Sequence, residues 1–156
     1  MEYPYCIKSR KNYPHVKLVA FGFKKPSEWD EQIIFVENPS REVLVKLYAH
    51  INIFYVPSIY EGWGLPAMEA MAQKCCVIAG DSGVIKEIGR DKINCIILED
   101  PRNKNEAINK LSELVCNPNL VSEIGEAART SVSNMSTTKS AKRFEEILMS
   151  LLKEYK

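Results

Sequence analysis

The segment that decides the fold is residues 51–69, with the sequence INIFYVPSIYEGWGLPAME. It opens with an apolar run of β-branched and aromatic residues at 51–56, which is typical of a buried strand. In the loop that follows, Gly62 and Gly64 allow tight or left-handed backbone. Pro66 then suits the first turn of a helix, where its missing N–H group is not needed. The segment therefore predicts a strand, a glycine-rich turn and a helix in immediate succession.

The rest of the chain also alternates short apolar runs with helical patterns. We expect strands at residues 16–21, 33–36, 51–56, 75–79 and 94–98, and helices at residues 41–50, 66–74, 83–88, 103–116 and 119–132. A last helix should begin at a cap formed by Ser136 and carry an apolar face that ends with Tyr155. Strands that alternate with helices predict an α/β protein with a doubly wound parallel sheet, covered by helices on both faces.

Length and charge exclude several classes of protein. The 156 residues suit one domain, and 46% hydrophobic residues exclude a disordered tail. A formal charge of +1 gives no excess of Lys and Arg for binding nucleic acid. The longest strongly apolar stretch, residues 51–56, is far shorter than the roughly 20 residues of a membrane span, and the N-terminus has no secretory signal. These features predict a cytoplasmic protein that does not bind nucleic acid.

The five cysteines form no metal-binding or disulfide pattern. None of them stands in a C-x-x-C pair, and His15 and His50 are isolated from other ligand residues. Cys75 and Cys76 are neighbours in an apolar run and should point to opposite faces of a strand. We therefore expect buried, reduced thiols and no metal site.

The loops after the strands form the expected binding site, because ligands of open α/β sheets lie outside the carboxyl ends of the strands. The N–H groups of Trp63, Gly64 and Leu65 lie at the start of the helix that contains Pro66. Unpaired N–H groups and the positive end of a helix dipole favour an anion. The turn therefore predicts a site for phosphate or diphosphate.

Two glutamates flank this turn. Glu69, which we expect within the first turn of the helix, can accept two hydrogen bonds from a ribose diol. Glu61 can reach sugar hydroxyls from the other side of the glycines. Each residue also has a simpler explanation, since Glu69 can complement the helix dipole, Glu61 can be solvated and Trp63 can be core. Their combination at the end of one strand favours a ligand site.

Residues 61–69, EGWGLPAME, closely resemble the E-G-F-G-L-P-x-x-E signature of retaining glycosyltransferase family 4, also known as group 1 glycosyl transferases. The similarity continues on both sides of the signature and covers about residue 17 to the C-terminus. Further matches are residues 47–58 to L-Y-x-x-A…P-S, 69–72 to E-A-M-A, 77–87 to a strand and a G-G-x-x-E loop, 94–98 to N-G-x-L-V, and 120–129 to L-x-x-x-G-x-x-A-R.

The resemblance implies the GT-B fold, in which two Rossmann-like domains face a cleft, and identifies this chain with the C-terminal domain that binds the donor. Residues 1–156 would form this single domain, with a stub of a truncated helix at 1–14, a Rossmann-like core at 15–135 and a C-terminal helix at 136–156 that crosses to the partner domain. The family's first strand, with an Arg and a Lys for the diphosphate, would lie upstream of Met1. The acceptor domain and its catalytic-site histidine would also be missing, so this chain alone should be inactive.

The resemblance also implies a reaction and residue roles. The whole enzyme would move a hexose from a UDP- or GDP-linked donor to an acceptor hydroxyl with retention of configuration, in glycan, glycolipid or polysaccharide synthesis, without a metal or another cofactor. Glu61 would be the catalytic-site residue that holds the donor sugar. The implied contacts with the donor sugar and diphosphate are Gly22, Glu61, Gly62, Trp63, Gly64, Leu65 and Gly83, and those with the nucleoside are Glu69, Val36 and Glu37.

The sequence departs from the family pattern at three places. Residues 74–76 replace a G-x-P turn, Ser82 replaces the first glycine of the G-G pair, and Cys95 replaces the glycine after Asn94. The change at Ser82 removes one flexible backbone position.

Other functions stay open at this stage. They are a GT-B nucleotide-sugar epimerase, a non-catalytic nucleotide-binding or regulatory α/β domain, and an interaction module that uses the last helix. The basic groups at residues 8–11 and 24–25 read as solvated charge, with weak contact to anionic lipids at the inner membrane surface as the alternative.

Overall fold

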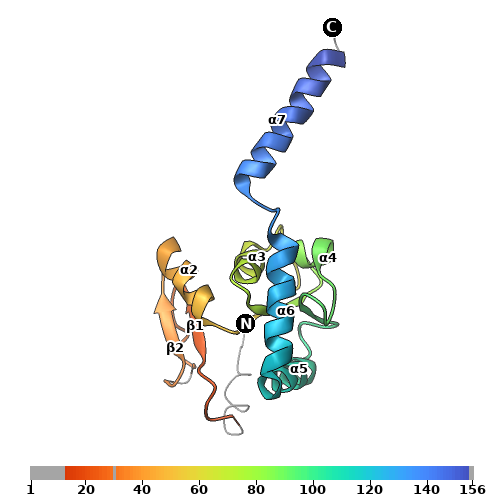
Figure 1. Cartoon of the computed structure of the whole chain (residues 1–156). Coiled ribbons are helices and arrows are strands. Elements are labelled where there is room, and N and C mark those ends of the chain that lie inside the picture. The colour runs from red at the N-terminus through yellow and green to blue at the C-terminus, as the bar shows by residue number, and fades with distance from the viewer. Residues whose placement is uncertain (1–12, 30, 155–156) are drawn as a thin grey trace.

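The computed structural model describes residues 13–29 and 31–154. The expected helical stub at residues 1–14, Cys6, the basic group at residues 8–11 and Tyr155 therefore lie wholly or largely outside the described residues. The elements in chain order are β1 (Val19–Gly22), β2 (Ile34–Glu37), α2 (Arg41–His50), β3 (Ile53–Val56), α3 (Leu65–Ala72), β4 (Cys76–Gly80), α4 (Val84–Ile88), β5 (Ile96–Leu98), α5 (Lys104–Cys116), α6 (Pro118–Val132) and α7 (Thr137–Glu154) (Figure 1).

All strand pairing is parallel, which confirms the α/β class, but the described strands hydrogen-bond in two groups rather than one. β1 pairs with β2, and β3, β4 and β5 form a second sheet with β4 in the middle. The facing strands β1 and β3 share no ladder, although the rings of Phe21 and Phe54 stack between them with centroids 6.2 Å apart. The ring of Tyr48 in α2 packs edge-on against the ring of Phe54, with centroids 5.4 Å apart. Side chains therefore join the two sheets where backbone hydrogen bonds do not.

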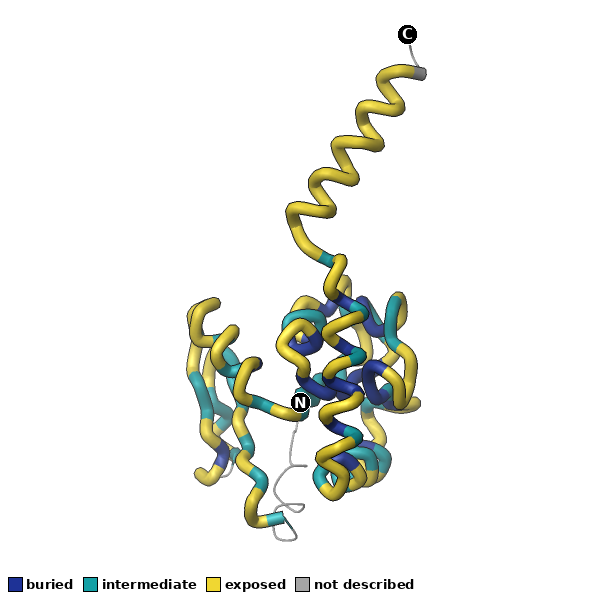
Figure 2. The backbone as a smooth tube through the Cα atoms, in the orientation of Figure 1, coloured by how far each residue is buried: buried dark blue, intermediate teal, exposed yellow. Residues whose placement is uncertain are grey.

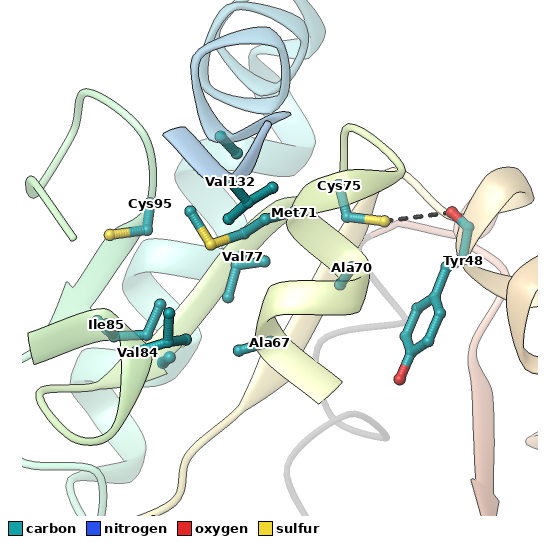
Figure 3. Close-up of a cluster of buried hydrophobic side chains, with 12 residues drawn as sticks. Tyr48, Ala67, Ala70, Met71, Cys75, Val77, Val84, Ile85, Cys95 and Val132 are labelled. Carbon is teal, nitrogen blue, oxygen red and sulfur yellow. Dashed lines mark hydrogen bonds between the residues drawn. The ribbon is translucent and has the colours of Figure 1, made fainter. Parts of the chain in front are cut away.

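β4 is the centre of the core, and all five of its residues are buried. Its two faces belong to two different apolar clusters. Cys75, just before the strand, lies in one cluster with Val77, Met71 and Tyr48, as Figure 3 shows. Cys76 lies in the other cluster, under α5 and α6. The expected opposite orientation of the two cysteines is confirmed.

The sheet of β1 and β2 is only partly covered. Val19 is 37% exposed and Ile34 is 54% exposed. The expectation that helices cover both faces of every strand is therefore wrong for this pair among the described residues. The physical reason is the connection of the chain, since α2 follows β2 directly and the later helices α3, α5 and α6 pack on the second sheet.

The last helix begins as expected, because the Ser136 hydroxyl accepts the N–H group of Lys139 over 3.2 Å. α7 then projects away from the rest of the chain, and its apolar residues are exposed, among them Phe144 and Leu152 at 62% each (Figure 2). Within residues 13–29 and 31–154, no helix combines the length and apolar character that crossing a membrane requires.

α6 lies close to the turn that follows α3. A Cβ atom added at Gly125 of α6 would lie 2.2 Å from the carbonyl oxygen of Lys74. Lys74 itself adopts a left-handed φ of 66° where the family pattern has glycine, and its ammonium group pairs with Glu126 at 2.5 Å. The glycine of the L-x-x-x-G-x-x-A-R match is thus explained by the approach of two backbones.

We predict that Gly125→Ala destabilises the chain by about 1–3 kcal/mol, because the added methyl group overpacks this contact. Alanine would ordinarily stabilise a helix relative to glycine, so the sign of the effect is diagnostic. Urea unfolding measures it, with Ser122→Ala at an exposed position of α6 as the control. A Gly125→Ala variant as stable as the wild type would contradict the close packing.

The buried thiols predict a pH dependence of stability. Burial raises the pKa of Cys75 and Cys95 from an ordinary 9.0 to about 11, and that of Cys76 to about 12. The folded chain therefore keeps these protons more tightly than the unfolded chain, and the resulting stability is complete below pH 9.0 and lost as the pH rises toward 11 to 12. Urea midpoints should fall across this range, and less steeply in Cys76→Val, which removes one titrating thiol. Equal slopes in both proteins would contradict this prediction.

Candidate functional site

The carboxyl ends of the parallel strands carry the loops that the sequence analysis selected. The loop at residues 57–64 follows β3 and leads into α3, and residues 81–83 follow β4 and lead into α4. Gly22 ends β1, and Val36 and Glu37 end β2. The structure thus places all of the expected site residues at strand ends or in the elements that follow them, divided between the two sheets.

The two loops of the second sheet contact each other through backbone. The N–H group of Val84 donates to the carbonyl oxygen of Trp63 over 2.6 Å. Gly83 has a φ of 55°, and a Cβ atom there would lie 2.6 Å from the same oxygen. Gly80 is equally constrained, because its Cβ atom would lie 2.4 Å from the carbonyl oxygen of Ser58. Only glycine fits these contacts without displacement of the loops.

Ser82 does not weaken this arrangement. The described non-glycine residues with positive φ are Asn38, Lys74 and Lys92, so Ser82 needs no flexible backbone. Its hydroxyl donates to the carbonyl oxygen of Ser58 over 3.4 Å. The replacement of the family's first glycine removes a flexible position, as expected, but the backbone at Ser82 does not use one, and the hydroxyl adds a contact between the loops.

Gly64 starts the helix. It adopts the left-handed conformation, with φ 81° and ψ 48°, and α3 begins at the next residue, Leu65, with Pro66 in its first turn. The first N–H groups of a helix have no partner inside the helix, and Pro66 has none to offer. Those of Gly64, Leu65 and Ala67 are thus available beside the positive end of the helix dipole.

Glu61 lies against this turn. The Ser58 hydroxyl donates to its Oε1 over 2.6 Å. The Cβ atom of Glu61 lies near the two glycines with positive φ. It would be 3.8 Å from a Cβ atom added at Gly64 and 3.0 Å from one added at Gly83. The cavity behind these residues measures about 10 Å³, room for about one water molecule. A sugar must therefore lie over the loops and not inside them.

The other residues of the turn are open. Trp63 is 45% exposed and Leu65 is 55% exposed, so the alternative that Trp63 is plain core is wrong. Gly62 has no positive φ, and a Cβ atom there would have no neighbour within 4 Å. Of the two glycines expected to allow tight or left-handed backbone, Gly64 adopts the left-handed conformation and Gly62 does not.

Glu69 lies farther along α3 than expected. It is the fifth residue of the helix, and no acidic residue stands in the first turn, because the helix already begins at Leu65. The effect of a helix dipole falls off within the first turn, so complementing the dipole is a weak explanation for this carboxylate. Glu69 Oε1 lies 3.6 Å from Nη1 of Arg41, and its side chain is 28% exposed. Burial, and then the charge of Glu69, raises the pKa of the Tyr48 hydroxyl to about 12.

The first sheet presents a separate group of backbone atoms. The N–H group of Asn38 donates to the carbonyl oxygen of Gly22 over 2.7 Å, and Asn38 has a left-handed φ of 44°. This bond fixes the segment after Val36 and Glu37 against the end of β1. A Cβ atom at Gly22 would make only an ordinary contact with Phe35, so packing does not explain this glycine.

Sequence reasoning missed two side chains that contact the expected site. Ser58 bonds Glu61, and Arg41 pairs with Glu69. The P-S pair of the family pattern pointed to Ser58 without a role, and no pattern pointed to Arg41, whose contact joins α2 to α3. Among residues 13–29 and 31–154, no group of three His, Cys, Asp or Glu side chains is arranged to hold a metal ion.

Comparison with known proteins points to one family. The family model for glycosyl transferases group 1 matches residues 8–131. The MMP alpha-(1->4)-mannosyltransferase of Mycolicibacterium hassiacum is 32% identical over 90 residues, which cover 58% of this chain and 22% of that protein. The chain thus spans less than a quarter of the length of this relative.

Solved structures share the fold. The C-terminal domain of the group 1 glycosyl transferase LpcC from Francisella tularensis has a TM-score of 0.73 and 28% identity, over 84% of this chain and 75% of that chain. TarM from S. aureus, solved with fondaparinux, alpha-GlcNAc-glycerol and UDP, has a TM-score of 0.70 over 90% of this chain and 32% of TarM. Its 24% identity shows the fold alone. The fold of this chain is that of the C-terminal domain of GT-B glycosyltransferases.

We predict that substitution of Gly83 and of Gly62 by alanine has different effects on stability. Gly83→Ala should lower the free energy of unfolding by about 1–3 kcal/mol, because alanine is strained at this φ and meets the Trp63 carbonyl group. Gly62→Ala should change it by less than about 0.5 kcal/mol, since its Cβ would be in open space. Thermal or urea unfolding of both variants tests the contact between the loops. Equal effects would contradict it.

Proposed function

This chain belongs to the group 1 glycosyl transferases, and we propose that it is the half of a retaining enzyme that binds the nucleotide-diphosphate sugar. The observation that carries the proposal is the left-handed turn at Gly64 into α3, with Glu61 on one side and Glu69 on the other. Unpaired N–H groups, a helix dipole and two carboxylates suit a ligand with a diphosphate between two sets of hydroxyl groups.

The diphosphate would lie over the start of α3. The N–H groups of Gly64 and Leu65 would donate to its oxygens, and Gly22 and Gly83 would let it approach the backbone. These donors are fixed before the donor binds, and charge develops on the diphosphate as the sugar leaves. Preorganised donors at such a position stabilise a transition state more than a ground state.

Glu61 would hold the donor sugar. Its Oε1 already accepts the Ser58 hydroxyl, which leaves its other oxygen to accept sugar hydroxyls. The open surface at Gly62, Trp63 and Leu65 gives the sugar room over the turn. On the front-face route, the departing phosphate would take the proton of the acceptor hydroxyl while the new bond forms on the same face of the sugar.

Glu69 would accept the two ribose hydroxyls, and the backbone of Val36 and Glu37 would border the base. Glu69 is partly buried and lies beyond the reach of the helix dipole, so a ligand diol is the stronger explanation for its position. The similarity in fold to TarM, solved with UDP, supports a nucleotide donor. The name of the M. hassiacum relative supports a hexosyl donor, with mannose the first to test.

The rest of the activity would need a partner domain. The chain spans 22% of the M. hassiacum relative and 32% of TarM, both much longer proteins. We propose that an acceptor-binding domain of the same polypeptide faces the loops described here and that the 156-residue chain alone transfers no sugar. The exposed apolar residues of α7 fit a helix that crosses to such a domain.

We predict that the 156-residue chain binds UDP or GDP more tightly than AMP in isothermal titration calorimetry. Glu69→Ala should weaken binding of the preferred nucleotide by about tenfold or more, which is the usual effect of losing hydrogen bonds to a charged group. Glu113→Ala, at an exposed position of α5, is the matched control and should bind like the wild type. Absence of UDP and GDP binding would contradict the donor site, and unchanged affinity in Glu69→Ala would contradict the ribose role.

A further inference from the structure

The proposed nucleoside site is divided between the two sheets. Val36 and Glu37 end β2 in the first sheet, and Glu69 belongs to α3, which packs against β3 and β4 of the second. The described strands make no backbone ladder between these sheets. The distance and orientation between the base-bordering segment and Glu69 therefore depend on side-chain contacts, which include the aromatic rings of Phe21, Tyr48 and Phe54 and the contact of α2 with α3.

Arg41 makes such a contact. It is the first residue of α2, four residues after Glu37, and its Nη1 lies 3.6 Å from Glu69 Oε1. The start of α2 is fixed locally, because the Ser40 hydroxyl accepts the N–H group of Val43 over 3.4 Å. The bond from Asn38 to Gly22 fixes the preceding turn. Arg41 thus links the end of the base-bordering segment to the carboxylate across the two sheets.

The exposure of the pair argues against a mainly structural role. The Arg41 side chain is 86% exposed, and exposed ion pairs add little to the stability of a fold. The contacts of the buried Tyr48 ring with the partly buried rings of Phe21 and Phe54 already join the sheets. The arginine therefore adds little to folding, and its described contact is the ion pair with the Glu69 carboxylate.

A carboxylate can contact Arg41 and two ribose hydroxyl groups at the same time. Its two oxygens offer about four acceptor positions. Arg41 Nη1 lies 3.6 Å from Oε1, which is an ion-pair distance and longer than a hydrogen bond, so both oxygens stay available for two hydroxyl groups. The positive charge beside Oε1 favours carboxylate orientations that keep this oxygen toward Arg41.

We propose that Arg41 is a positioning residue for ribose recognition, which holds the Glu69 carboxylate in the orientation that accepts both hydroxyls of a nucleoside diphosphate. The proposal rests on the proposed function, because it assigns a partner to Glu69 in the same site. Arg41 acts through Glu69 and needs no contact with the nucleotide.

The test compares UDP and GDP with their 2′-deoxy forms in calorimetry on the 156-residue chain. The wild type should prefer the ribonucleotide, because the deoxy form lacks one hydroxyl. Arg41→Gln should weaken binding of the ribonucleotide by about three- to tenfold and binding of the deoxynucleotide by less than about twofold. This is the effect expected when a hydrogen bond from the ribose to the charged Glu69 loses its geometry. Arg41→Lys, which keeps the charge, should restore part of the preference. Arg143→Gln, whose partner is Glu146 on α7, is the control and should change neither affinity.

Each result decides the proposal. An equal loss for both nucleotides in Arg41→Gln would place Arg41 on the phosphate or base and overturn the positioning role. An unchanged preference would overturn it as well, while leaving the donor site intact. Absence of any UDP or GDP binding by the wild type would instead overturn the proposed function, and the role of Arg41 with it.

Discussion

The backbone contact between the loops after β3 and β4 determines the geometry of the whole site. The Trp63 carbonyl group accepts the N–H group of Val84, and Gly83 lies against the same oxygen at a φ that other residues rarely adopt. Because this contact fixes the loop before Gly64, it also fixes where α3 begins. The start of α3 in turn decides which N–H groups are free and where Glu61 and Glu69 lie on either side.

The division into two sheets explains why the site is built from unlike parts. The second sheet supplies rigid loops, a helix start and two carboxylates, all supported by the fully buried strand β4. The first sheet supplies backbone at Gly22 and residues 36–38, and it is joined to the second by aromatic rings and by the pair of Arg41 and Glu69.

Much of this architecture follows from local sequence patterns. Apolar runs, a helix cap and the glycines near residue 64 predicted the order of elements, and Ser136 caps the last helix as expected. Contacts between distant segments could not be predicted in this way. The tight fit of Gly125 on Lys74, the bond from Ser82 to Ser58 and the pair of Arg41 and Glu69 each join residues that no local pattern relates. Glu69 was expected in the first turn and lies just beyond it, because the helix begins one residue earlier, at Leu65 and not at Pro66.

The most direct test is an NMR titration of the ¹⁵N-labelled chain with UDP and with GDP. The largest amide shifts should occur at Gly64 and Leu65, with further shifts near Glu69 and after β2, since these are the groups proposed to contact the diphosphate and the nucleoside. A separate groove lies between the end of α4 and α6 and is lined by Glu87, Ile88, Gly89, Arg90, Ile93, Asn94, Ala127, Thr130 and Ser131. Shifts confined to this groove would contradict the assignment of the start of α3 as the diphosphate site.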